Sequence, residues 1–236
     1  MKIKTVTTVD VTAIITVRNG AKTIIKAVES VLTQMPRGEP HSRVIVIDGQ
    51  STDGTIDQIR HYPDIHILNQ QSKGLAGARN EALAKVKTPL VAFCDADDAW
   101  TPESLQKKLD RMVKVPSSWA ISGQVHFETT AHSNSGLPAR RLSGTEHRGV
   151  TPGAMLIKRS AFDAVGGFDE NLRIGSDADW VIRAVQTLGP QNFIDMVVLN
   201  KGIRAGSLST DIATYRSELQ HIARGFIERS RGDVQK

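Results

Sequence analysis

Three carboxylates lie within four residues in the segment Asp95-Ala96-Asp97-Asp98, which directly follows an apolar run from Leu90 to Cys94. Carboxylates at this spacing repel one another unless a positive group lies between them, and aspartate oxygens suit Mg²⁺ or Mn²⁺. Ligands of open α/β sheets gather at the carboxyl ends of strands. The segment therefore predicts either a divalent metal site or a solvated acidic turn before a helix, and by itself it favours neither.

Two further polar segments are candidates for a nucleotide site. Asp48 follows a second predicted strand of the same sheet, so we expect it at the same edge; its local alternative is to shape an Asx turn. The run from Lys73 to Asn80 places two glycines and two cations at a helix N-terminus, where backbone amides and the helix dipole favour phosphate. Arg79 within this run is equally well interpreted as an ordinary surface cation.

A third constellation is the segment Ser176-Asp177-Ala178-Asp179-Trp180. Ser176 followed three residues later by Asp179 predicts a capping box, which gives Asp179 a structural role at the start of a helix. Asp177 has no such role. It is therefore the candidate general base of this segment.

The elements that must position these residues follow an α/β pattern. Short β-branched runs alternate with helical periodicities up to about residue 115, which is typical of a parallel sheet covered by helices. The second half is less regular, and a polar stretch at 131–152 is too long for a routine connection. Thr101 is expected to cap the helix after the acidic segment. The predicted strands are 11–17, 43–47, 65–68, 90–94, 119–128, 153–157 and 192–199, and the predicted helices are 24–35, 56–59, 75–86, 101–113, 176–188 and an amphipathic segment from about 209.

Composition excludes several classes of function. The chain has 236 residues, 39% of them hydrophobic, and a formal net charge of +5, which suits an anionic partner without identifying it. The seven histidines have no metal-ligand spacing, and no basic-aromatic platform indicates nucleic-acid binding. The single cysteine, Cys94, excludes an internal disulfide and is expected to pack in its strand. We expect no signal peptide and no membrane span, and the single cysteine fits a reducing compartment.

Taken together, the motifs resemble those of the family 2 glycosyltransferases, enzymes of the GT-A fold that use nucleotide sugars. The resemblance extends from about residue 11 to about residue 209. Its specificity comes from the order of the motifs, because no single motif is specific. The segments that carry it are 15–20, 27–34, 48–55, 74–80, 95–98, 162–170 and 177–180.

The resemblance implies an α/β architecture of the GT-A type, in which helices flank a mixed sheet. Residues 1–236 are expected to form one domain, with a nucleotide-binding half to about residue 115, an acceptor half at about 116–209 and a C-terminal helix at 210–236. Such an enzyme is expected in the cytoplasm, and peripheral association with the inner face of the membrane stays open. A basic group in the long polar stretch suits a phosphate-bearing acceptor, although a solvated loop is the simpler interpretation; this group is Arg140, Arg141 and Arg148.

The resemblance also assigns donor-side roles to individual residues. These residues would contact the nucleotide sugar or hold Mn²⁺ or Mg²⁺ as the cofactor. The set is Thr16 and Asn19 against the nucleotide, Asp48 at the base, Arg79 near the base or the diphosphate, Asp95 at the ribose or the metal, and Asp97 as metal ligand.

On the acceptor side, the resemblance implies that Asp177 is the catalytic base and that Asp179 and Trp180 belong to the acceptor signature. The base would take the proton of an acceptor hydroxyl that attacks the anomeric carbon opposite the leaving group, and this displacement inverts the configuration. The donor would be a UDP-, dTDP- or GDP-linked sugar. The acceptor would be a saccharide or a lipid-linked saccharide, with no role for nucleic acid.

Three positions depart from the family pattern. Gly49 stands where the family often has a second acid, and Ser176 stands where a glutamate commonly precedes the base. Arg204 lies where many relatives carry a histidine that can ligate the metal; a guanidinium cannot ligate a cation, but it can pair with a diphosphate. These departures predict an active but variant site with fewer protein ligands for the metal.

Two other functions stay open on the sequence. A nucleotidyltransferase would share the sheet and the carboxylates, but it would be expected to use a glycine-rich basic loop after the first strand, and residues 18–22 are a poor version of one. A non-catalytic nucleotide-sugar binding protein derived from the fold fits the departures at Gly49 and Arg204.

Overall fold

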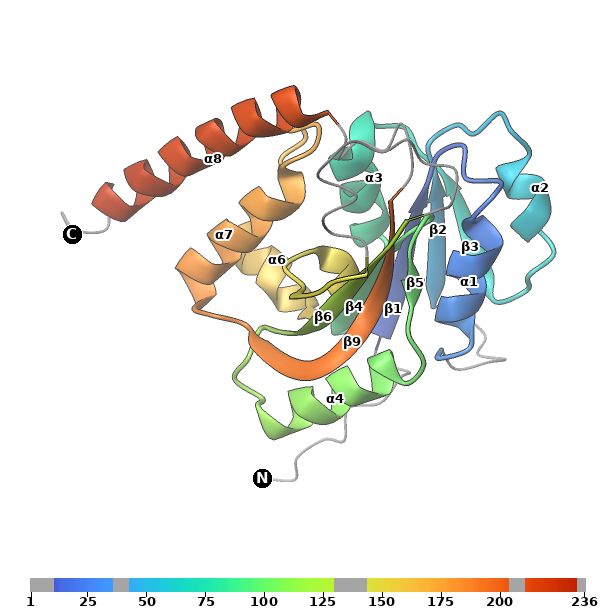
Figure 1. The fold of residues 1–236 in the computed structure, drawn as a ribbon, viewed down its shortest axis with the longest axis horizontal. Coiled ribbons are helices and arrows are strands. Elements are labelled where there is room, and N and C mark those ends of the chain that lie inside the picture. Colours follow the sequence, from blue (N-terminus) through green and yellow to red (C-terminus); the bar gives the residue numbers. More distant parts are fainter. Residues whose placement is uncertain (1–10, 36–42, 130–143, 204–210, 233–236) are drawn as a thin grey trace.

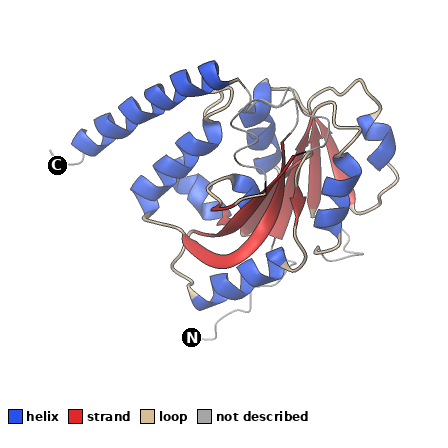
Figure 2. Cartoon of the chain, in the orientation of Figure 1, coloured by secondary structure: helices blue, strands red, loops and turns tan. Residues whose placement is uncertain are grey.

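One mixed sheet forms the centre of the fold, and helices cover both of its faces (Figures 1 and 2). The computed structural model describes residues 11–35, 43–129, 144–203 and 211–232. Within these residues the sheet has nine strands, in the order β3-β2-β1-β4-β8-β6-β9-β5, and β7 pairs with β6. The predicted fold class, an α/β mixed sheet flanked by helices, is confirmed.

The first half of the chain builds the parallel part of the sheet. β1 (Val11–Val17) lies between β2 (Val44–Asp48) and β4 (Leu90–Asp95), and β3 (Ile65–Asn69) extends the sheet beyond β2; all three pairings are parallel. β1 and β2 are buried along their whole length, which explains their nearly continuous apolar sequences. The helices of this half are α1 (Ile24–Leu32), α2 (Thr55–Ile59) and α3 (Gly74–Leu83).

The second half makes the sheet mixed. β8 (Met155–Lys158) runs antiparallel to both β4 and β6 (Ala120–Thr129), whereas β9 (Asn192–Ile203) runs parallel to β6. Two short strands complete the sheet: β5 (Ala99–Trp100) pairs with β9, and β7 (Glu146–Arg148) pairs with β6. The other elements are α4 (Ser104–Lys114), a 3₁₀ turn at Pro152–Ala154, α6 (Arg159–Val165), α7 (Ser176–Leu188) and α8 (Ile212–Gly232).

Each face of the sheet packs against its own set of helices. On one face, strand residues such as Ile15 pack with Val28 of α1 and Leu105 of α4. On the other face, residues such as Phe93 pack with α3, α6 and α7 around the buried Trp180. Successive side chains of a strand point to opposite faces, so each central strand contributes to both cores. This packing fixes the ends of β1, β2 and β4, from which the predicted site residues extend.

Most predicted elements are confirmed, and the differences have local causes. The predicted cap by Thr101 is wrong: α4 begins at Ser104, Glu103 before it has a left-handed backbone (φ 60°), and the Thr101 hydroxyl donates to the Val197 carbonyl (2.6 Å). The predicted strand at 153–157 begins later, at Met155, because a 3₁₀ turn precedes it. The sequence does not predict β5, β7 or α6, because such short elements show no clear period.

The last helix, α8, packs on α7 and extends past it (Figure 1). Its contact with the body of the fold uses Ile222, which is 3% exposed, and Glu218, which accepts hydrogen bonds from three successive backbone amides, at residues 173–175. None of the helices in the described residues has the length and apolar character that a bilayer span requires. The large apolar side chains that α8 leaves exposed are Tyr215, Leu219, Phe226 and Ile227.

Candidate active site

The acidic segment turns sharply at the carboxyl end of β4, beside the end of β1. The Asp98 amide donates to the Asp95 carbonyl (2.9 Å), which closes the turn, and the Ala96 amide donates to the Thr16 carbonyl (3.1 Å). The Thr16 hydroxyl donates to Asp95 Oδ1 (3.0 Å). Thr16 and Asp95 are also register partners in the parallel pair of β1 and β4. The structure therefore brings these two predicted site residues into direct contact.

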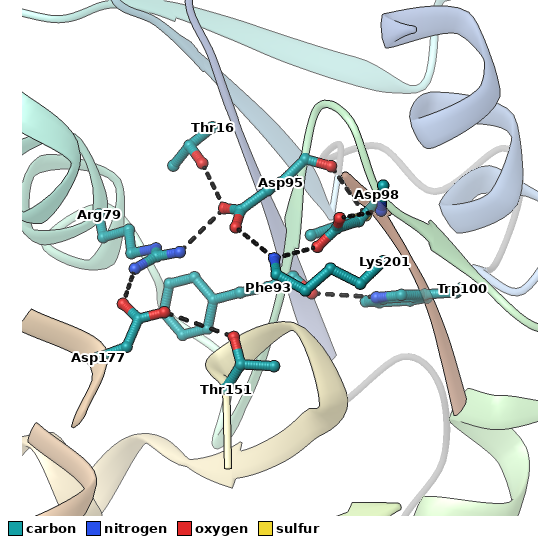
Figure 3. A network of polar contacts seen from close by, with 11 residues as sticks. Thr16, Arg79, Phe93, Asp95, Asp98, Trp100, Thr151, Asp177 and Lys201 are labelled. Atoms are coloured by element: carbon teal, nitrogen blue, oxygen red, sulfur yellow. Dashed lines mark hydrogen bonds and ion pairs between the residues drawn. The ribbon is translucent and has the colours of Figure 1, made fainter. Parts of the chain in front are cut away.

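Arg79 links this acidic turn to the first turn of α7. Its guanidinium is 1% exposed and donates to Asp95 Oδ1 from Nη2 (2.9 Å) and to Asp177 Oδ1 from Nη1 (Figure 3). Burial opposes the charge, but Asp177 and Asp95 outweigh burial and raise the pKa of Arg79 above its usual range. The interpretation of Arg79 as an ordinary surface cation is wrong, because two carboxylates share this buried side chain.

Asp177 faces the acidic turn across the Arg79 guanidinium (Figure 3). Its Oδ2 accepts a longer hydrogen bond from the Thr151 hydroxyl (3.4 Å), and its side chain is 25% exposed. Thr151 precedes the 3₁₀ turn that leads into β8. The candidate base is therefore held between two elements, and it keeps access to solvent.

The predicted capping box beside Asp177 is wrong. The N-cap position of α7 is Gly175, and no side chain caps the helix. The Ser176 hydroxyl is buried and has no hydrogen-bond partner among the described residues. Asp179 instead pairs with Arg183, four residues on (2.7 Å). A serine and an acid at capping-box spacing thus fail to form the box, because the helix begins one residue earlier than the pattern requires and Ser176 lies inside it.

Trp180 lies in the core beneath the site. Its side chain is fully buried, its Nε1 donates to the Gly166 carbonyl (2.8 Å), and its ring stacks on Phe162 with centroids 4.3 Å apart. The described contacts of Asp179 and Trp180 are internal. Their predicted place on the acceptor side stays a prediction.

Asp98, the last acid of the segment, points into the protein and pairs with Lys201 of β9. Its side chain is 1% exposed and accepts hydrogen bonds from Lys201 Nζ (2.9 Å) and from the Gly202 amide (3.0 Å). Burial raises the pKa of Asp98 to about 7, although Lys201 acts in the opposite direction. Burial also opposes the charge of Lys201, but Asp98 and Asp95 raise its pKa above the ordinary lysine value. Lys201 thus remains a cation within the acidic turn.

The loops that follow β1 and β2 are tied together beside this site. Asp48 is buried and accepts a hydrogen bond from the Ser51 amide (3.1 Å), so the local alternative for this residue, a role in shaping the turn, is confirmed. Asn19 has a left-handed backbone (φ 51°), and its side-chain oxygen accepts a hydrogen bond from the Thr52 amide (2.9 Å). The structure places both residues at the predicted sheet edge. Their contacts with a nucleotide stay predictions.

The sequence did not predict two residues of the site, Lys201 and Thr151. Neither lies in a recognisable motif, and only the pairing of β9 and the turn before β8 brings them to the acidic turn and to Asp177. Conversely, Arg204, Arg140 and Arg141 lie outside the described residues. Arg148 lies in β7 with its guanidinium over the Phe193 ring, 5.2 Å from the centroid. Cys94 is buried in its strand as expected.

The acidic turn fits a divalent cation only in part. Asp95 and Asp98 already contact internal donors, and the described residues contain no group of three or more histidine, cysteine or acidic side chains that could hold a metal ion. Asp97 is half-buried at the middle of the turn. Mg²⁺ commonly uses one or two protein carboxylates and completes its shell with water and substrate phosphate. The residues present can supply a site of that kind, in which Asp97 would be the principal carboxylate; the metal and this role of Asp97 stay predictions.

The fold has counterparts among solved structures. The crystal structure of S. aureus TarS 1–349 in complex with UDP-GlcNAc aligns with a TM-score of 0.65 and 18% identity, and the match covers 85% of this chain and 60% of that one. The structure of the same protein in complex with UDP aligns with a TM-score of 0.64 and 17% identity, and the match covers 82% of this chain and 60% of that one. Identity at this level establishes the fold alone. The predicted GT-A fold is confirmed.

Sequence comparison establishes the family. The family profile described as "Glycosyl transferase family 2" matches residues 12–166. The succinoglycan biosynthesis protein ExoU of Rhizobium meliloti is 30% identical over 227 residues, which are 85% of this chain and 64% of that protein. The putative teichuronic acid biosynthesis glycosyltransferase TuaG of Bacillus subtilis is 36% identical over 110 residues, 44% of this chain and 42% of TuaG. The chain belongs to glycosyl transferase family 2, and it spans only about two fifths to two thirds of the length of these relatives.

Proposed function

We propose that the chain is an inverting glycosyltransferase that moves a sugar from a nucleoside diphosphate sugar to an acceptor hydroxyl. The observation that carries the proposal is the guanidinium of Arg79, which binds both Asp95 at the donor-side turn and Asp177 on α7. A general base must lie close to the reacting centre, and the acidic turn marks the expected position of the donor diphosphate. Asp177 satisfies this requirement, since one buried side chain separates it from Asp95.

In the proposed reaction, Asp177 accepts the proton of the acceptor hydroxyl as its oxygen bonds to the anomeric carbon. The bond from that carbon to the diphosphate oxygen breaks on the opposite face, so the configuration inverts. A bound Mn²⁺ or Mg²⁺ would offset the negative charge on the departing nucleoside diphosphate. Arg79 holds Asp177 in position and keeps a positive charge beside the donor site.

The loop after β1 does not favour the nucleotidyltransferase alternative. The amides of Asn19, Gly20 and Ala21 donate to Ser51 Oγ (2.8 Å), Thr55 Oγ1 (2.9 Å) and Asp53 Oδ2 (3.0 Å). A phosphate-binding loop would present such amides to its ligand. The membership of the chain in glycosyl transferase family 2 also favours a glycosyltransferase over a nucleotidyltransferase.

The test is a screen followed by product analysis. Thermal shift with UDP-, dTDP- and GDP-sugars, with and without Mn²⁺, identifies a donor, because a ligand that binds the native state raises apparent stability. With that donor and a panel of saccharide and lipid-linked acceptors, the proposal expects release of nucleoside diphosphate and an inverted anomeric centre. Release of pyrophosphate from a nucleoside triphosphate would favour the nucleotidyltransferase, and binding without turnover would favour the non-catalytic binder.

For the acceptor, we propose a lipid-linked saccharide that is met at the inner face of the membrane. The relative WfaP of Escherichia coli, 37% identical over 123 residues (51% of this chain, 41% of WfaP), is named a UDP-Glc:alpha-D-GlcNAc-diphosphoundecaprenol beta-1,3-glucosyltransferase. In this chain, α8 carries exposed apolar side chains together with Arg216, Arg224 and Arg229, a combination that suits a surface of anionic lipid.

Flotation with phosphatidylglycerol vesicles tests the membrane contact. The double substitution Phe226→Ser and Ile227→Ser should reduce binding to the vesicles. Ile25→Ser removes a similarly exposed apolar side chain from α1 and should leave binding unchanged. Equal flotation of all three proteins would remove the support that α8 gives to this proposal.

A further inference from the structure

The proposed reaction gives no role to Lys201, although the fold brings this lysine into the acidic turn. β5 follows the turn directly and pairs antiparallel with β9, with Ala99 opposite Asn200. The next residues of β9 therefore lie beside the acids. The approach is close enough that a Cβ at position 202 would overlap the Asp97 carbonyl, so the glycine there allows β9 to reach the turn.

The ammonium of Lys201 lies between two of the three acids. Its Nζ is 2.9 Å from Asp98 Oδ2 and 3.7 Å from Asp95 Oδ2 (Figure 3). Arg79 pairs with the other oxygen of Asp95 at 2.9 Å. The side chain of Lys201 is 27% exposed, whereas that of Asp98 is 1% exposed. The ammonium of Lys201 thus lies between carboxylates that would otherwise attract a free cation.

We propose that Lys201 is a built-in counter-ion that competes with a divalent cation for the acidic turn, so that Mn²⁺ or Mg²⁺ binds well only together with the donor diphosphate. A divalent cation beside Asp95 is repelled by the ammonium, and the two negative charges of a diphosphate restore the attraction. The inference rests on the proposed donor chemistry. Beyond that chemistry, we infer that Lys201 weakens the binding of the metal alone. The metal therefore binds well only when the donor is bound.

The experiment measures binding of Mn²⁺ to the whole chain by the loss of the free-ion signal in electron paramagnetic resonance. Wild-type protein should bind Mn²⁺ weakly alone and at least about tenfold more tightly with UDP, dTDP or GDP. Lys201→Gln retains a donor for Asp98 but removes the charge, so its affinity for Mn²⁺ alone should rise by about tenfold or more. Lys201→Arg retains the charge and should behave as wild type.

The matched control is Lys26→Gln. It removes the same charge from an exposed ion pair with Glu128, whose atoms are 2.9 Å apart, and should leave Mn²⁺ binding unchanged. If Lys201→Gln does not fold, Asp98→Asn is compared with the double variant Asp98→Asn/Lys201→Gln, in which the buried pair becomes two amides. The double variant should bind Mn²⁺ alone more tightly than Asp98→Asn by a similar factor.

Two results would overturn the inference. One is that removal of the Lys201 charge leaves the affinity for Mn²⁺ alone unchanged in both backgrounds. The other is that wild-type protein binds Mn²⁺ alone as tightly as with a nucleoside diphosphate. Failure of the proposed function is a different result: no sugar would be transferred from any nucleotide sugar, whereas the comparison of variants with Mn²⁺ alone needs neither a nucleotide nor turnover.

Discussion

Arg79 and Asp177 form an ion pair across 98 residues of sequence, and the guanidinium is buried beneath the site that the pair helps to define. Arg79 also pairs with Asp95, so the donor-side turn and the proposed base belong to one network. Two carboxylates that face each other without this cation would repel one another. The network therefore depends on Arg79 both for its stability and for the position of Asp177.

Arg79→Gln is expected to lower both stability and activity. Removal of one partner from a buried ion pair leaves charge uncompensated, and the expected loss in the free energy of unfolding is about 3 kcal/mol. The turnover number should fall more than about a hundredfold, because Asp177 loses its position. Urea denaturation and initial rates measure the two effects.

The control variant is Arg159→Gln, which breaks an exposed pair with Asp163 and should change the free energy of unfolding by less than about 0.5 kcal/mol. Full activity in Arg79→Gln would contradict the positioning role.

Asp177→Asn is expected to abolish most transfer while the donor still binds. A general base contributes about 10² to 10⁴ in rate, and an amide cannot accept the acceptor proton. The turnover number and the dissociation constant of the nucleoside diphosphate should be measured separately, since only the first is expected to change strongly. Asp163→Asn, at an exposed acid of α6, is the control. Unchanged transfer in Asp177→Asn would exclude this residue as the base.

The sequence predicts most of the site because each motif directly follows a strand or begins a helix whose periodicity is clear. Asp48 and Asp95 end buried parallel strands, and parallel strands deliver their carboxyl ends to one edge. Asp177 lies in the first turn of a long helix. For such residues, placement follows from the order of elements alone.

The remaining contacts depend on pairings that no local pattern encodes. Lys201 reaches Asp98 only because the two-residue strand β5 pairs with β9. Arg79 lies in the middle of α3, and nothing in the sequence around it indicates burial. In the structure α3 packs on the sheet, and the guanidinium carbon lies 5.5 Å from the centroid of the Phe168 ring. Tertiary structure determines which charged residues pair when they lie far apart in the sequence. Composition and hydrophobic periodicity do not predict such pairs.

Glu218→Gln is expected to loosen α8. Burial acts to raise the pKa of Glu218, but the amides of residues 173–175 outweigh it and lower the pKa below the ordinary value. The carboxylate therefore contributes stability above its unfolded pKa, and this contribution is lost as the pH falls through the lower folded pKa. At pH 7 the substitution should weaken docking of α8 by about 1 to 2 kcal/mol, measured as faster limited proteolysis within α8. Glu228→Gln, at an exposed position of α8, should not change the rate of cleavage.

Lys108→Met is expected to stabilise the protein at neutral pH. Lys108 is fully buried in α4, its Nζ lies 5.2 Å from the centroid of the Trp100 ring, and it has no hydrogen-bond partner among the described residues. Burial lowers the pKa of Lys108 to about 7. The unfolded chain therefore binds one more proton than the folded chain between pH 7 and the ordinary lysine pKa, and wild-type stability should rise with pH across this window.

Methionine removes this dependence and fills a similar volume. The gain in the free energy of unfolding at pH 7 should be at most about 5 kcal/mol and should shrink as the pH approaches 10, because the unfolded wild-type chain also loses the proton there. Urea denaturation at pH 7, 8.5 and 10 measures the trend. Lys107→Met, at the neighbouring exposed lysine of the same helix, should show no such pH dependence. A gain for Lys108→Met that is equal at all three pH values would mean that packing, and not the buried charge, determines the effect.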